Sequence, residues 1–125
     1  MSESINVLYV EDNESDVMLL ELGIERYATH FNIELNVTST VTEAKALFEK
    51  NIYDVALIDC DLPDGKGIDV VQFIRKRNVT LPIYLLSGLM TDSHRASVAQ
   101  YSAIKCLEKN YSQHFIEEIY RGIKV

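Results

Sequence analysis

Short apolar runs alternate with amphipathic stretches along the chain. Five strands are predicted, at residues 5–10, 33–37, 53–58, 83–86 and 104–107. The first, third and fourth are almost wholly apolar, which is typical of strands buried on both faces, whereas the second and fifth contain polar residues and predict sheet edges. Between the strands, apolar positions three or four residues apart predict five helices. The first starts after the capping residues 13–16, the second at a capping box Thr40-Val41-Thr42-Glu43, the third after the loop 63–67, the fourth near Thr91 and the fifth at Ser112.

Repeated strand-helix units need right-handed crossovers, and these give a parallel sheet covered by helices on both faces. The fold class expected is therefore a doubly wound, flavodoxin-like α/β fold. Because the two polar strands suit the edges, the sheet order 2-1-3-4-5 fits the pattern. No linker, repeat or low-complexity stretch interrupts the chain, so residues 1–125 are expected to form a single domain.

Composition narrows the function classes. The chain of 125 residues is 47% hydrophobic and has 19 acidic against 12 basic residues, a formal net charge of −7. This balance argues against nucleic acid and against an anionic membrane surface as partners. No apolar run reaches the roughly 20 residues of a membrane span, and the start MSESINVLYV lacks a basic signal-peptide region, so a cytoplasmic location is expected. Cys60 and Cys106 lie in apolar segments and are expected to be reduced thiols.

Polar residues follow the predicted strands where each strand ends. They are Glu11 and Asp12 after the first, Asp59 and Asp61 after the third, Ser87 after the fourth and Lys109 after the fifth. Each one alone has an ordinary structural reading as a strand end or helix cap. In a parallel sheet, however, the carboxyl ends of the strands share one edge, and like charges gathered there are unfavourable without a shared cation. Oxygen ligands in an open site favour Mg²⁺ over a caged Ca²⁺.

Lys109 and Ser87 add a cation and a hydroxyl to this predicted edge. Such groups can neutralise and hold phosphoryl oxygens, so the site suits phosphoryl transfer to a carboxylate. The residues by themselves leave open whether Asp59 or Asp61 would be the acceptor.

The strings VEDN at 10–13 and LIDCDLPDGKG at 57–67, with Ser87 and Lys109, resemble the receiver domain of two-component response regulators. The resemblance covers essentially the whole chain. It implies that a histidine kinase or histidine phosphotransfer protein phosphorylates Asp59, four residues before Pro63. It also implies a set of Mg²⁺ ligands, with Asp12 and Asp59 binding directly, Glu11 through water and Asp61 through its backbone carbonyl.

The same resemblance implies that Ser87 is the switch hydroxyl and that Lys109 contacts the phosphoryl group. Such a domain assists its own phosphorylation and dephosphorylation without being a turnover enzyme, and it signals through a changed surface to a downstream protein or an output domain. Two positions depart from the family pattern. Cys106 replaces the usual aromatic switch residue, and Asn110 replaces a cis-linked proline, so we expect a trans peptide there.

Two alternatives remain at this stage. A degenerate receiver would act as an unphosphorylated docking module, which is suggested by Cys106 and Asn110. A phosphatase of the haloacid dehalogenase type is suggested because Asp59-Cys60-Asp61 looks like that family's paired aspartates. That reading is disfavoured because its motif normally lies on the first strand, is followed by Thr or Val where Pro63 stands, and needs downstream acids in a pattern that is not found after Ser87.

Overall fold

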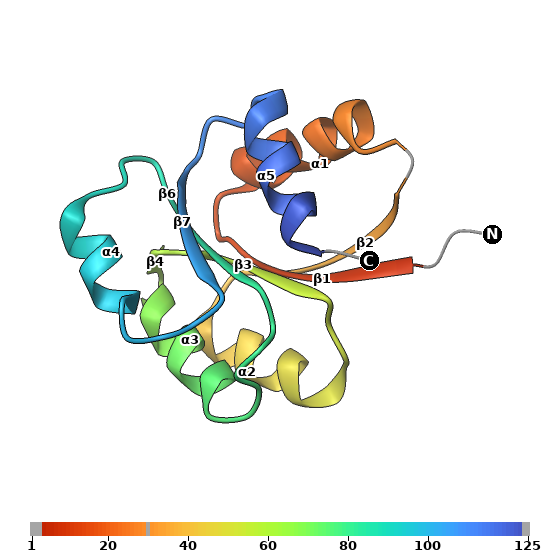
Figure 1. Ribbon diagram of the computed structural model, residues 1–125. Coiled ribbons are helices and arrows are strands. Elements are labelled where there is room, and N and C mark those ends of the chain that lie inside the picture. Colours follow the sequence, from red (N-terminus) through yellow and green to blue (C-terminus); the bar gives the residue numbers. More distant parts are fainter. Residues whose placement is uncertain (1–3, 30, 124–125) are drawn as a thin grey trace.

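A computed structural model describes residues 4–29 and 31–123. The main sheet has five parallel strands in the order β2-β1-β3-β6-β7 (Figure 1). These strands are β1 (Ser4–Val10), β2 (Asn32–Thr38), β3 (Val55–Asp59), β6 (Ile83–Ser87) and β7 (Ile104–Glu108). The predicted class and the order 2-1-3-4-5 are thus confirmed. Both edge strands are the partly polar ones, and the three inner strands are buried along most of their length.

Helices cover both faces of the sheet (Figure 1). They are α1 (Glu14–Tyr27), α2 (Val41–Lys50), α3 (Gly67–Arg75), α4 (Asp92–Val98) and α5 (Gln113–Ile123). α1 and α5 share one core with the sheet, while α2, α3 and α4 share the other. Side chains alternate between these cores along each inner strand: Leu8 enters one and Tyr9 the other, and both are fully buried. No helix in the described part of the chain is long and apolar enough to cross a membrane.

Side-chain caps begin the helices near the predicted positions. Asn13 accepts a hydrogen bond from the Asp16 amide at 3.0 Å, and Ser112 accepts one from the Phe115 amide at 3.2 Å. Thr40 accepts one from the amide of Glu43, as a capping box requires. The second bond of a capping box, from the Thr40 amide to the Glu43 side chain, is replaced by other contacts, however. The Glu43 carboxylate accepts from the Thr38 hydroxyl at 2.8 Å and, more weakly, from the Ser39 amide at 3.4 Å, because the preceding residues wrap over the helix start.

The segment predicted as a loop at 63–67 is largely a small antiparallel hairpin. Its strands, β4 (Asp61–Leu62) and β5 (Gly65–Lys66), pair across a turn at Pro63 and Asp64. Asp64 then reaches α2, where its carboxylate accepts from the amides of Val41 at 2.7 Å and Thr42 at 3.1 Å. These bonds, the one to Val41 first, lower the pKa of Asp64. The hairpin that follows β3 is therefore tied to the N-terminus of α2.

Arg75 is a buried cation at the end of the sheet opposite the carboxyl ends of the strands. Its guanidinium donates to the carbonyl oxygens of Leu81 at 2.7 Å, Ser102 at 2.9 Å and Asn78 at 3.0 Å. Burial lowers the pKa of Arg75, and the carbonyl partners satisfy its donors. The side chain thereby joins the end of α3 to the segments that lead into β6 and β7.

Candidate functional site

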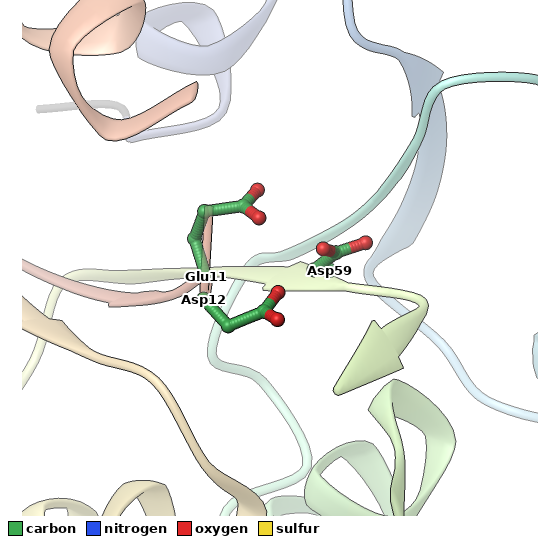
Figure 2. Close-up of side chains that lie close together, drawn as sticks. All are labelled: Glu11, Asp12 and Asp59. Carbon is green, nitrogen blue, oxygen red and sulfur yellow. The ribbon is translucent and has the colours of Figure 1, made fainter. Parts of the chain in front are cut away.

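Three carboxylates meet where β1 and β3 end, at the point where the strand order reverses. Figure 2 shows Glu11 and Asp12, which follow β1, beside Asp59, the last residue of β3. One oxygen from each side chain lies within 4.8 Å of the others. Glu11 and Asp59 are buried and Asp12 is exposed, so the cluster has an inner part and one arm open to solvent.

Lys109 supplies the positive charge at this cluster. It directly follows β7, and its Nζ atom lies 2.9 Å from Glu11 Oε1 and 3.2 Å from Asp59 Oδ2. A third carboxylate, that of Asp16, lies 3.1 Å from the same atom. The Lys109 side chain is only 10% exposed, so these ion pairs are shielded from solvent.

The protonation equilibria reflect this crowding. The pKa of Glu11 is raised to about 7, because burial and the neighbouring Asp59 raise it more than the Lys109 ammonium lowers it. For Lys109, burial disfavours the charged form, but Glu11, Asp59 and Asp16 outweigh it and raise the pKa of the ammonium. The two buried carboxylates, Glu11 and Asp59, are thus stabilised by one more positive charge, which either a proton or a metal cation can supply.

Asp59 is held from several sides. The Asp61 amide donates to Asp59 Oδ1 at 3.3 Å, which leaves Oδ2 to Lys109. Behind the strand, Gly67 begins α3 and packs against the Asp59 backbone, and a β-carbon on Gly67 would overlap the Asp59 carbonyl oxygen. Gly67 also donates its amide to the Cys60 carbonyl at 2.8 Å. Only a glycine allows this close approach of helix to strand.

Asp61 does not bring its side chain into the cluster. Its carboxylate is 72% exposed and pairs with Lys66 across the β4–β5 ladder at 3.1 Å. The two candidate acceptors left open by the residues alone therefore differ in environment, because Asp59 faces Lys109 and Asp61 faces solvent. The role predicted for the Asp61 backbone carbonyl stays a prediction.

Ser87 lies on the strand next to β3, and its hydroxyl is hydrogen-bonded to its own chain. It ends β6, is 8% exposed, and its hydroxyl donates to the Leu89 carbonyl at 3.0 Å and accepts from the Leu89 amide at 3.3 Å. Its carbonyl accepts from the Lys109 amide at 2.8 Å, which sets the two strand ends side by side. The expectation that its hydroxyl points at the same place as Lys109 stays a prediction.

Asp16 is the site residue that the sequence pattern did not single out. It lies in the first turn of α1 among residues interpreted as caps, and its partner Lys109 is 93 positions away. A carboxylate four residues after Asp12 is the only signal that could have drawn attention to it.

The two departures from the family pattern have ordinary local structures. Cys106 is a half-buried free thiol on β7, and burial raises its pKa. Cys60 is buried, and burial followed by the charges of Asp59 and Asp61 raises its pKa to about 12, so neither thiol is activated. No cis peptide occurs among the described residues, which confirms the trans bond before Asn110. The Asn110 side chain accepts from the Ser112 amide at 3.1 Å.

The chemistry of the cluster fits a hard divalent cation. All three carboxylates offer oxygen, the set is small, and Asp12 is open to solvent, as suits an ion that keeps several waters. Such an acidic cluster is typical of the Mg²⁺ site of receiver domains.

Comparisons with known proteins agree with this arrangement. The family model of the response regulator receiver domain matches residues 7–121. The transcriptional regulatory protein CusR of Escherichia coli is 37% identical over 108 residues, which cover 86% of this chain but 46% of CusR. The chain thus spans less than half of that relative.

Two solved structures illustrate the likeness of fold. The non-phosphorylated HemR receiver domain of Leptospira biflexa has a TM-score of 0.80 at 27% identity, covering 97% of this chain and 95% of that one. The receiver domain of sensor histidine kinase PA1611 from Pseudomonas aeruginosa has a TM-score of 0.81 at 22% identity, covering 98% and 100%. That second structure has a magnesium ion coordinated in its active site cleft.

A receiver domain is a phosphoacceptor rather than a turnover enzyme, so the phosphatase alternative is set aside. The family match over nearly the whole chain, the sheet order and the acidic cluster beside Lys109 lead to one assignment. This chain belongs to the response regulator receiver domain family.

Proposed function

We propose that residues 1–125 form one phosphorelay receiver, in which Asp59 accepts a phosphoryl group from a phosphohistidine donor in a Mg²⁺-dependent reaction. The observation that carries the proposal is the position of Asp59. Asp59 belongs to the acidic cluster with Asp12, contacts the Lys109 ammonium and is the last residue of an inner strand. Among the described residues, it is the one carboxylate that meets all three conditions. Glu11 also belongs to the cluster and contacts Lys109, but it lies just after the end of β1, and its pKa is raised.

The chemistry requires little from the protein beyond placement and charge. A carboxylate oxygen of Asp59 forms a bond to phosphorus, the P–N bond of the phosphohistidine breaks, and its electron pair returns to the imidazole. Glu11, Asp12 and Asp59 would hold Mg²⁺, with the Asp61 carbonyl as a further ligand. Bound there, Mg²⁺ offsets charge on the phosphoryl oxygens. Lys109 would donate to one of those oxygens, and Ser87 would turn from Leu89 to donate to another.

The donor is proposed to be a histidine kinase or a histidine phosphotransfer protein that docks on α1. Support comes from three apolar side chains exposed on that helix: Met18 at 59%, Leu19 at 45% and Leu22 at 53%. Exposed apolar residues grouped on one helix are suited to a protein partner. Because α1 starts two residues after Asp12, a partner bound there would lie close to the acceptor. The phosphorylated surface would signal to a downstream protein or an output domain.

Intact-mass measurement tests the acceptor. The protein is incubated with acetyl phosphate and Mg²⁺, and separately with a phosphorylated histidine phosphotransfer protein. We expect a single phosphoryl adduct that Asp59→Asn abolishes. Asp61→Asn is the matched control, since it removes the same charge two residues away, at an exposed side chain, and should leave the adduct. An adduct lost in both variants or in neither would contradict Asp59 as the acceptor, and no adduct on the wild type would favour the unphosphorylated docking module.

A further inference from the structure

Asp16 is held in a defined place beside the acidic cluster. Its amide is capped by the Asn13 side chain at 3.0 Å, and its carbonyl accepts a long hydrogen bond from the buried Tyr9 hydroxyl at 3.5 Å. The backbone of this first turn is therefore tied to the end of β1. From there the Asp16 carboxylate, which is 25% exposed, reaches Lys109 Nζ at 3.1 Å.

The Lys109 ammonium has three N–H donors, and three carboxylates surround it. Its partners are Glu11, Asp16 and Asp59, all within 3.2 Å of Nζ. Each donor can thus be matched to one carboxylate. Charge-assisted bonds of this kind are short and strongly orienting, so together they fix the ammonium group.

The three partners of Lys109 differ in what else they can bind. Glu11 and Asp59 belong to the acidic cluster with Asp12, whereas the group of carboxylates close enough to share an ion does not include Asp16. A divalent cation at the cluster would therefore compete with Lys109 for Glu11 and Asp59. A phosphoryl group on Asp59 would in addition remove that carboxylate's charge. Asp16 is the partner of Lys109 that would keep its contact after both metal binding and phosphorylation.

We propose that Asp16 is a positioning residue, which anchors the Lys109 ammonium beside Asp59 while Glu11 and Asp59 are engaged with Mg²⁺ and the phosphoryl group. This inference rests on the proposed function of the same site. Without the anchor, Lys109 would be held by fewer charges at the moment when it has to meet a phosphoryl oxygen. Loss of orientation, rather than loss of a reacting group, is the expected effect of removing Asp16.

Glu14 offers a matched control for this idea. It is the first residue of α1, carries the same charge in the same turn, and is exposed. Among residues 4–29 and 31–123, no ion pair involves Glu14. Glu14→Gln therefore removes a negative charge near the site without touching Lys109, and Asp16→Asn removes one that contacts it.

The first readout is the lysine ammonium signal in ¹H–¹⁵N NMR spectra of the whole protein. The Lys109 signal is assigned by its absence in Lys109→Met and is followed with saturating Mg²⁺. In the wild type and in Glu14→Gln we expect slow hydrogen exchange with water. Asp16→Asn should speed this exchange severalfold, and Asp16→Glu should restore part of the protection. Unchanged exchange in Asp16→Asn would overturn the proposal.

The second readout is the rate of phosphorylation by acetyl phosphate at saturating Mg²⁺. Asp16→Asn should lower it about tenfold, as expected when one charge-assisted contact that orients a catalytic cation is lost, and Glu14→Gln should not. Faster exchange with an unchanged rate would overturn the positioning role. If the wild type forms no adduct, the proposed function fails, and the anchor is then judged on the exchange measurement alone.

Discussion

The Nζ atom of Lys109 lies 3.2 Å from Oδ2 of Asp59, although 50 positions separate the two residues in the chain. The contact brings a cation from the end of β7 to a carboxylate at the end of β3, across the intervening strand β6. It also gives the carboxylate oxygen of Asp59 a charged hydrogen-bond donor.

Replacement of Lys109 by Met should slow phosphorylation by about 10²-fold or more, since a preorganised donor aimed at developing charge is removed. The measurement is the initial rate of adduct formation with acetyl phosphate and saturating Mg²⁺. Lys105→Met serves as the control because that lysine is 67% exposed and lies 3.8 Å from Glu118. A rate for Lys109→Met close to the wild-type value would contradict the role of the ammonium.

The stability of the metal-free protein should fall as the pH rises through about 7. Glu11, whose pKa is raised to about 7, stays protonated in the folded state over a range where an unfolded glutamate, near about 4.3, has already ionised. Between these two pKa values the folded state binds more protons than the unfolded state. The stabilisation due to Glu11 is therefore complete below its pKa in the unfolded state and is lost above its pKa in the folded state. The pKa values of Glu43 and Asp64 are lowered, so those groups titrate below this window.

Thermal melts with Mg²⁺ and with a chelator, between about pH 5.5 and about pH 8, measure this linkage. The difference in Tm between the two conditions should widen with pH, because Mg²⁺ binds the ionised cluster. Glu11→Gln should flatten the metal-free profile. A metal-free Tm that rises over the same interval in the wild type, but not in Glu11→Gln, would show that the sign is wrong.

Substitution of Gly67 by Ala should destabilise the fold by about 2–4 kcal/mol, because the new methyl group overlaps backbone rather than a movable side chain. Since the overlapping atom is the Asp59 carbonyl oxygen, Mg²⁺ affinity should fall as well. Urea unfolding and Mg²⁺ titration are the measurements. Gly88→Ala is the control, as a β-carbon there meets no atom within 4 Å. Equal stability of the two variants would mean that the contact at Gly67 relaxes without cost.

Arg75→Met should cost about 3 kcal/mol of unfolding free energy, because several buried carbonyl oxygens lose their donor while the apolar stem is kept. Lys76→Met, at the exposed neighbouring position, should change stability by less than about 0.5 kcal/mol. Chemical denaturation of both variants gives the comparison. Neither substitution should prevent phosphorylation under conditions where the protein stays folded, since Arg75 lies at the opposite end of the sheet from Asp59.

Much of the fold could be predicted because its signals are local or periodic. The apolar inner strands, the polar edge strands and the caps at Asn13 and Ser112 are all visible over a few residues. The β4–β5 hairpin escaped prediction because strands of two residues have no measurable period. Arg75 appears in the sequence as one more charge at a helix end, and only the folded chain shows the carbonyl groups around it.

The site shows the same division. Glu11, Asp12, Asp59 and Lys109 could be predicted to converge because the carboxyl ends of parallel strands share an edge. Asp16 could not, since a carboxylate in a first helical turn has a sufficient local explanation. The orientation of Ser87 could not be predicted either, because a hydroxyl at a strand end can bond to its own chain two residues on, as it does to Leu89.

The contact between Glu11 and Lys109 spans 98 positions of the chain. Synthesis proceeds from the N-terminus, so Glu11 leaves the ribosome long before the lysine that pairs with it. A nascent chain that ends before β7 carries the carboxylates of Glu11 and Asp59 but not the lysine that pairs with them. Competence to receive a phosphoryl group should therefore be among the last properties that a growing chain acquires, and C-terminal truncations ending before Lys109 should lack it even where they retain helix and strand.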